Sequence, residues 1–295
     1  MAALITLGAI IFCGVSMHRL GYSHADLDGL FALFAGLWAF GHVAQGLGAR
    51  WIPDFCKLFA LYFGLALVAP LAAAILVTLG FPLVDAQLAA ADRILIPGFS
   101  WPALAWWFGS HDTISSALSH AYKTLGWQPL LLFAVLIVSG RSRTAWQVMS
   151  AWSIALLVCV LTFCIAPALD AYTYFAIGHA DMPGILSNTS WNAPHILIGI
   201  RNGTINTLGN RTLEGLISMP SFHAAGAAIL AWGYAKVDLL RWPFLALNLA
   251  MLASAIPVGG HYVVDIVAGL LAAILAVFVV EMWREAQDEK ARQSR

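Results

Sequence analysis

The segment S-M-P-S-F-H-A, at Ser218–Ala224, places a histidine at the predicted start of a helix. Pro220 and Ser221 are residue types that favour the first positions of a helix. A helix start leaves backbone N–H groups unpaired and carries the positive end of the helix dipole, so it is suited to bind an anion. His223 then lies in the first helical turn, beside whatever anion binds there.

A second segment, G-G-H-Y-V-V-D at Gly259–Asp265, contains a histidine and an aspartate four positions apart. Residues at this spacing share one face of a helix, so His261 and Asp265 can contact each other. A carboxylate that accepts the proton of one imidazole nitrogen fixes the tautomer and leaves the other nitrogen as a nucleophile. Taken alone, the pair is equally explained as a helix-stabilising hydrogen bond, and His223 as an interfacial side chain.

The composition predicts what kind of element positions these residues. The chain has 295 residues, of which 61% are hydrophobic and only 10% are charged, whereas an ordinary soluble domain carries roughly 25% charged residues. Soluble and disordered proteins are therefore excluded. Lys and Arg together number 15, as do Asp and Glu, and no basic run is present, so no nucleic-acid partner is expected. We predict an all-α, polytopic bundle of transmembrane helices.

We expect about eight spans, because a helix that crosses the hydrocarbon needs about 20 mostly apolar residues. The expected spans are 2–17, 29–48, 58–81, 115–139, 148–169, 221–237, 242–258 and 262–283. Residues 83–108 are too polar to cross, and there Leu88 and Leu95 share one helical face while Asp85 and Asp92 share another. This pattern predicts an interfacial helix.

The basic residues predict the orientation of the bundle. Of the 15 Lys and Arg residues, ten share the predicted side of the N-terminus, and five lie on the opposite side: Arg19, Arg93, Lys123, Arg201 and Arg211. The positive-inside rule then places both termini in the cytoplasm and the two histidine segments on the outer face. The Ala/Leu/Gly-rich composition favours a bacterial inner membrane.

The two segments together predict a phosphoryl-transfer site that needs no metal. P-S-F-H at Pro220–His223 and G-H-Y-V-V-D at Gly260–Asp265 resemble two motifs of the phosphatidic acid phosphatase type 2 superfamily. The resemblance is strongest to its inositolphosphotransferase-like branch, which includes inositol phosphorylceramide synthase. It covers roughly residues 83–283, and it implies a six-helix-type catalytic core. Only the two motifs are sharply specific.

The resemblance implies a role for each motif residue. His261 would attack phosphorus and form a phosphohistidine, Asp265 would orient it, and His223 would protonate the leaving oxygen. Ser221 and backbone N–H groups near Ser221 and Phe222 would hold phosphate oxygens. His261 must then be neutral while His223 is cationic, so a bell-shaped pH profile is expected.

The cationic residues of the superfamily are missing from their usual places. No Lys followed by Arg-Pro precedes Pro220, and the position of the usual arginine in the third motif is Ala255. We predict Arg201 and Arg211 as substitutes on the outer loop. Both arginines are also interpreted as solvated loop charges or as lipid headgroup binders. This interpretation is stronger for Arg211 than for Arg201. If neither reaches the site, the chain would be a degenerate member with weak or no activity.

The main functional hypothesis is therefore a membrane-embedded phosphatase or phosphotransferase that acts on a lipid phosphate or phospholipid, with a hydroxyl group as one acceptor and no metal or cofactor. Two alternatives stay open, a polyprenyl-pyrophosphate phosphatase and a non-catalytic transporter or scaffold that uses the His and Asp groups. We divide the chain into N-terminal transmembrane helices (1–81), a catalytic core (82–283) and a charged cytoplasmic tail (284–295). Membrane lipids surround it, and the oligomeric state is not predicted.

Overall fold

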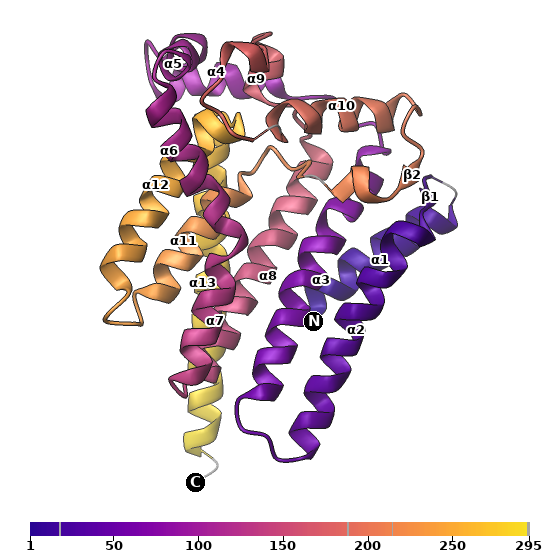
Figure 1. The fold of residues 1–295 in the computed structure, drawn as a ribbon, viewed down its shortest axis with the longest axis vertical. Helices are drawn as coiled ribbons and strands as arrows, with labels where there is room; N and C mark the ends of the chain where they lie inside the picture. Colours follow the sequence, from indigo (N-terminus) through magenta and orange to yellow (C-terminus); the bar gives the residue numbers. More distant parts are fainter. Residues whose placement is uncertain (18, 188, 214, 294–295) are drawn as a thin grey trace.

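The computed structural model describes residues 1–17, 19–187, 189–213 and 215–293, with the side chain of Arg211 also outside the description. The fold is an all-α bundle, as predicted (Figure 1). In chain order its elements are α1 (Ala2–Ser16), β1 (Gly21–Tyr22), α2 (His24–Gly46), α3 (Ile52–Val77), α4 (Asp85–Leu95), α5 (Trp101–Gly109), α6 (Asp112–Lys123), η1 (Thr124–Gly126), α7 (Gln128–Val138), α8 (Ser142–Ile165), α9 (Ala171–Tyr174), η2 (His179–Asp181), α10 (Thr189–Arg201), β2 (Thr207–Leu208), η3 (Asn210–Leu213), α11 (Phe222–Tyr234), α12 (Arg241–Gly259) and α13 (Val263–Gln293).

Helix length gives fewer spans than the sequence predicts. Among the described residues, five helices are long and apolar enough to cross a membrane, namely α2, α3, α8, α12 and α13. A sixth span arises if α6 with η1 and α7 are counted together across their 49° bend. The expectation of about eight is not met because α1 has 15 residues and α11 only 13, which is about 20 Å of helix for α11 against roughly 30 Å of hydrocarbon. The chain is a multi-pass membrane protein.

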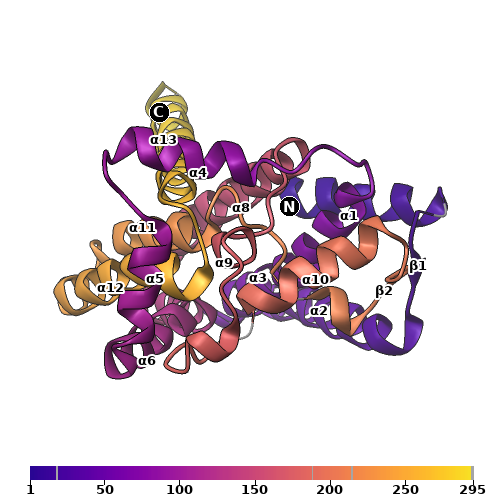
Figure 2. The ribbon, with the colours of Figure 1, turned by 90° about the horizontal axis from the view of Figure 1, so that it is seen from above.

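The long helices pack around two centres. Helix α3 contacts α1, α2 and α8, whereas α8, α11 and α13 contact one another and α12 packs on α11 and α6. The short helices α4, α5, α9 and α10 lie across one end of the bundle, as seen from the side in Figure 1 and from above in Figure 2. They cover the ends of α11, α12 and α13, where both histidine segments are located.

The two ends of the bundle carry the two groups of basic residues. At the end that holds the C-terminus, Arg143 forms an ion pair with Asp288 at 2.6 Å and Lys236 with Glu281 at 3.6 Å. At the opposite end, β1, which follows Arg19 closely, pairs in parallel with β2 in the loop between α10 and α11. Residues that the sequence assigns to opposite membrane faces therefore lie at opposite ends of the bundle.

Helix α4 forms in the segment expected to be interfacial, but its acidic face points inward. Asp85 and Asp92 are only 5% and 2% exposed, whereas Ile94 and Leu95 at the end of the helix are exposed. The buried carboxylates accept backbone N–H groups of neighbouring segments, which explains how they tolerate burial. An amphipathic pattern shows that a helix has two faces, but not which of them the protein covers.

Candidate active site

Ser221 links the two motifs at the start of α11. Its Oγ accepts the N–H of Ala224 at 3.3 Å, which is the N-cap geometry expected from its residue type, and its own N–H donates to the backbone oxygen of Asp265 at 3.0 Å. Because of these bonds, the free N–H groups of the first turn in the described structure are those of Phe222 and His223. An anion at this helix start would therefore bind one position further along than Ser221.

Helices α11 and α13 approach closely at this point because α13 carries a glycine. A Cβ atom on Gly269 would lie 2.2 Å from the backbone oxygen of Ser221, a distance that no side chain tolerates. At the other end of the motif, Gly260 ends α12 in the left-handed conformation, with φ of +65°. These two glycines bring the second motif against the first.

His261 and Asp265 contact each other as predicted, but they do not share a helix face, because α13 begins at Val263 and His261 lies in the turn before it. Nδ1 of His261 lies 3.5 Å from Oδ2 of Asp265, and the side chains are 4% and 0% exposed. Oδ2 also accepts the N–H of Tyr262 at 2.9 Å, which fixes the carboxylate. The His–Asp separation is at the outer limit of a hydrogen bond, a geometry common in active sites without substrate. Since Nδ1 faces the carboxylate, Nε2 is the nitrogen available for a reaction.

His223 lies beside a tyrosine that the sequence did not identify. Its ring stacks on Tyr122 of α6, with the ring centroids 3.6 Å apart and the planes at 14°. A Cβ on Gly259 would lie 3.0 Å from the Tyr122 hydroxyl and 2.7 Å from Cδ2 of His261. Tyr122 thus packs on His223, near the turn that carries His261. It lies more than a hundred residues from either histidine in the chain, so no local spacing could indicate it.

Three side chains from residues 85–101 hold the turn around His261. Asp92 accepts the N–H groups of Val263 and Val264 at 2.9 and 2.8 Å, so it caps the start of α13. Asp85 accepts the Tyr262 hydroxyl at 3.1 Å, and the Trp101 indole donates to the backbone oxygen of His261 at 3.1 Å. Burial raises the pKa of both carboxyls above the ordinary aspartate range. These are positioning residues for the histidine.

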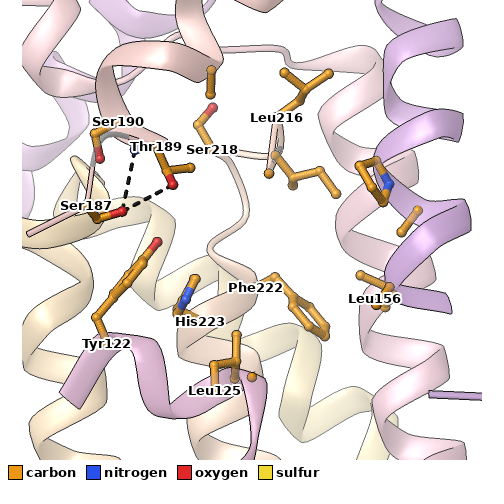
Figure 3. A pocket seen from close by; sticks show the side chains of 18 of the residues that line it. Tyr122, Leu125, Leu156, Ser187, Thr189, Ser190, Leu216, Ser218, Phe222 and His223 are labelled. Carbon is orange, nitrogen blue, oxygen red and sulfur yellow. Dashed lines mark hydrogen bonds between the residues drawn. The ribbon is translucent and has the colours of Figure 1, made fainter. Parts of the chain in front are cut away.

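Both histidines line one cavity of about 540 Å³. Figure 3 shows His223, Phe222 and Tyr122 on one side of it and a row of hydroxyl side chains on the other. Asp265 lies behind His261, and Ser221 caps the helix without lining the cavity. The remaining lining is largely apolar and comes from α3 and α8: Tyr62, Leu65, Ala66, Ala69, Trp152 and Leu156.

The predicted cations do not gather at this cavity. Arg201 donates from Nη2 to the backbone oxygen of Phe81 at 2.6 Å and lines a separate hollow near Arg19. The side chain of Arg211 lies outside the described residues. Among the described residues that line the cavity, only Lys123 carries a permanent positive charge, and its Nζ donates to the backbone oxygen of Leu186 at 2.9 Å. The sequence predicts Lys123 on the same side as Arg201 and Arg211, but it indicates no role for it.

The comparisons with known proteins agree with this geometry. A family model described as PAP2 superfamily matches residues 86–279, which is more than half of the chain and contains both motifs. The comparisons with curated proteins and with solved structures gave no match. Within the described residues, no group of three or more His, Cys, Asp or Glu side chains is arranged to hold a metal ion. The chain belongs to the PAP2 superfamily, a membership that indicates a phosphatase-type enzyme.

Proposed function

We propose that the protein removes a phosphoryl group from a membrane lipid through a phosphohistidine on His261. The single observation that carries this proposal is the shared cavity: His223 and His261 both line it, and Asp265 lies 3.5 Å behind His261. A nucleophile oriented by a carboxylate and a second imidazole for proton transfer are the groups that such a reaction requires.

The reaction proceeds in two balanced steps. Burial and the neighbouring His261 lower the pKa of His223, so His223 is neutral before substrate binds and becomes cationic by taking the proton of the bound phosphate monoanion. In the first step, Nε2 of His261 attacks phosphorus, the bond from phosphorus to the ester oxygen breaks, and His223 gives its proton to that oxygen. In the second, a hydroxyl oxygen attacks the phosphohistidine, the P–N bond breaks with its electron pair returning to His261, and neutral His223 takes the hydroxyl proton. Asp265 stabilises the positive charge on His261 during both steps. Positioning and charge neutralisation supply most of the catalysis.

Donors for the phosphate oxygens come from two elements. The N–H groups of Phe222 and His223 at the start of α11 are free to donate to an anion, and the helix dipole adds positive potential there. We assign the cationic part to Lys123, because it lines the same cavity. Arg201 donates to a backbone oxygen elsewhere, so Lys123 is the better candidate for the role that the sequence gave to the loop arginines.

The apolar part of the cavity supports a lipid substrate. Residues of α3 and α8, including Leu65, Ala66 and Leu156, extend the lining away from the histidines. Apolar lining of this kind binds hydrocarbon, with a few polar groups to fix the orientation. Phosphatidic acid and polyprenyl pyrophosphate both combine a phosphate group with an apolar chain. The distribution of basic residues supports a site on the outer face of the membrane.

Release of phosphate from defined lipids tests the proposal. Purified protein in lipid nanodiscs should release phosphate from phosphatidic acid or polyprenyl pyrophosphate, and His261→Ala should reduce the rate by about 10⁴-fold or more. His120→Ala is the matched control, because His120 is exposed on α6 and does not line the cavity. Equal rates for His261→Ala and the native protein would overturn the proposal.

A further inference from the structure

The row of hydroxyl side chains in the cavity lies opposite the catalytic histidine. Figure 3 shows Ser187, Thr189, Ser190 and Ser218 facing Tyr122 and His223 across the open space. The first three come from the start of α10 and the residues before it, and Ser218 comes from the loop before α11. The phosphohistidine reaction described above does not use any of them. We call this row, together with Asp170, the hydroxyl wall.

The three serines of the hydroxyl wall donate their protons within the protein, whereas Thr189 Oγ1 accepts from Ser187. Ser190 Oγ donates to the backbone oxygen of Val258 at 2.9 Å, and Ser218 Oγ donates to that of Ala168 at 2.7 Å. Ser187 Oγ donates to Thr189 Oγ1 at 3.2 Å. A hydroxyl has one proton and two acceptor positions, so these three serines have already used their protons. They therefore face the cavity as hydrogen-bond acceptors.

Asp170 adds a fourth acceptor to the wall. Its side chain lines the cavity and is only 3% exposed. Oδ1 accepts the N–H of Thr173 at 2.6 Å, while Oδ2 has no hydrogen-bond partner among the described residues. A buried carboxyl oxygen without a partner costs free energy, so native proteins keep such a group where a ligand completes it.

Asp170 is also joined to the turn that carries the nucleophile. The N–H of Ala171 donates to the backbone oxygen of Gly260 at 2.8 Å, next to His261. Cβ of Asp170 lies 3.3 Å from the position of a Cβ on Gly260. A group bound by Asp170 is therefore held close to the phosphorylated histidine.

The chemistry of the hydroxyl wall distinguishes between the two parts of the reaction. Phosphate oxygens are acceptors and need donors, which the start of α11 and Lys123 provide. A wall of acceptors instead matches a ligand that brings several O–H donors. We propose that Asp170, Ser190 and Ser218 bind a polyhydroxylated acceptor, so that one of its hydroxyl oxygens attacks the phosphohistidine. This inference rests on the proposed function and extends it from hydrolysis to transfer. The same chemistry describes a free polyol and a lipid with a polyol headgroup.

Partition of labelled phosphate tests the inference. Phosphatidic acid with ³²P in its phosphate is turned over in the presence of glycerol, monoacylglycerol or butanol at equal hydroxyl concentration. The label is then measured as free phosphate and as phosphorylated acceptor. We expect transfer to glycerol or monoacylglycerol to exceed transfer to butanol. More transfer to glycerol would indicate a free polyol as the acceptor, whereas more transfer to monoacylglycerol would indicate a membrane lipid with a polyol headgroup.

Variants of residues in the hydroxyl wall test whether the transfer reaction depends on that wall. Asp170→Asn should lower the ratio of transfer to hydrolysis by about 10-fold, because it replaces an acceptor with an amide donor, while the phosphoenzyme still forms. Ser218→Ala should lower the ratio of transfer to hydrolysis by a smaller factor. It provides the test if the Asp170→Asn protein does not fold. Asp181→Asn, at an exposed carboxylate outside the cavity, is the control.

Three results would overturn the inference. Release of free phosphate without transfer to any acceptor would show that the enzyme is a hydrolase, and the proposed function would stand. Transfer with an unchanged ratio in both wall variants would place the acceptor elsewhere. If neither free phosphate nor a phosphoenzyme forms, the proposed function itself fails, and the inference fails with it.

Discussion

The cavity joins two regions that differ in origin. The reacting groups come from α11 and the turn before α13, inside the range matched by the family. Much of the apolar lining comes from α3 (Ile52–Val77), which lies before that range. The difference suggests a division of labour under the proposed function, in which the superfamily region carries the chemistry and the helices before it select the lipid chain. Variants in the two regions should therefore change different properties of the enzyme.

Loss of the proton donor should have the largest effect after loss of the nucleophile itself. We expect His223→Ala to reduce kcat by about 10²- to 10⁴-fold on lipid phosphates, because an alkoxide is a poor leaving group without a proton. With p-nitrophenyl phosphate, whose leaving group needs no proton, the loss should be small. Rates on both substrates provide the measurement, and an equal loss on both would contradict the role as general acid.

Filling the apolar region should change chain selectivity and leave the chemistry intact. Ala66→Phe in α3 should reduce kcat/KM for a long-chain lipid phosphate by about 10-fold or more, since the added ring occupies space for the chain. A short-chain phosphate should react at the native rate. Ala35→Phe, at an exposed position of α2 away from the cavity, is the matched control. An equal loss of kcat/KM for the long-chain and the short-chain phosphate would show that α3 does not select the chain, and would contradict the proposed difference between α3 and the histidine region.

Removing the cation of the cavity should weaken phosphate binding. Lys123→Ala should raise KM several-fold, or about 10-fold at low salt, because the positive charge is partly exposed and screened. Arg201→Ala should leave KM close to native, since its guanidinium contacts Phe81 elsewhere. KM values for both variants at two salt concentrations provide the measurement. A larger increase in KM for Arg201→Ala than for Lys123→Ala would instead assign phosphate binding to Arg201.

The smallest expected effect is a change of stability with pH. Burial raises the pKa of Asp170 to about 7, whereas an unfolded aspartate titrates near pH 4. Between these values the folded state holds the proton more tightly, so stability falls as the pH rises from about 4 to about 7. Asp170→Asn removes this dependence and should raise the unfolding temperature at pH 8 by about 5 °C but not at pH 4. Equal shifts at both pH values would contradict the burial of an ionising carboxyl.

The sequence predicted the fold class and the elements of the site that are local in the chain. Low charge together with apolar runs of about 20 residues indicated an all-α membrane bundle, because a helix of that length crosses the lipid and satisfies its own backbone groups. Within a motif, residue types have local meanings: Ser221 caps a helix, and His261 and Asp265 lie close enough in the chain to meet. The structure brings these groups together, with His223 on the same cavity as His261, but His261 lies in the turn before α13 and not on its face.

Long-range contacts could not be predicted in this way. Asp92 caps a helix that starts 171 residues later in the chain, and Tyr122 stacks on a histidine in another helix. Neither has a local signal, because its role is set by tertiary packing. The same reason applies to Arg201, whose position in an outer loop suggested a reach toward the site that the packing does not provide. It applies also to α3, which looks like an ordinary span.

Direct detection of the covalent intermediate tests the central claim. The protein is mixed with ³²P-labelled lipid phosphate, stopped within the first turnover in alkali, digested and analysed by mass spectrometry. We predict a phosphoryl group on His261 that is stable in alkali and lost in acid, and that is absent from His261→Ala. Turnover of the lipid without a phosphoenzyme, or with the label on another residue, would contradict the account.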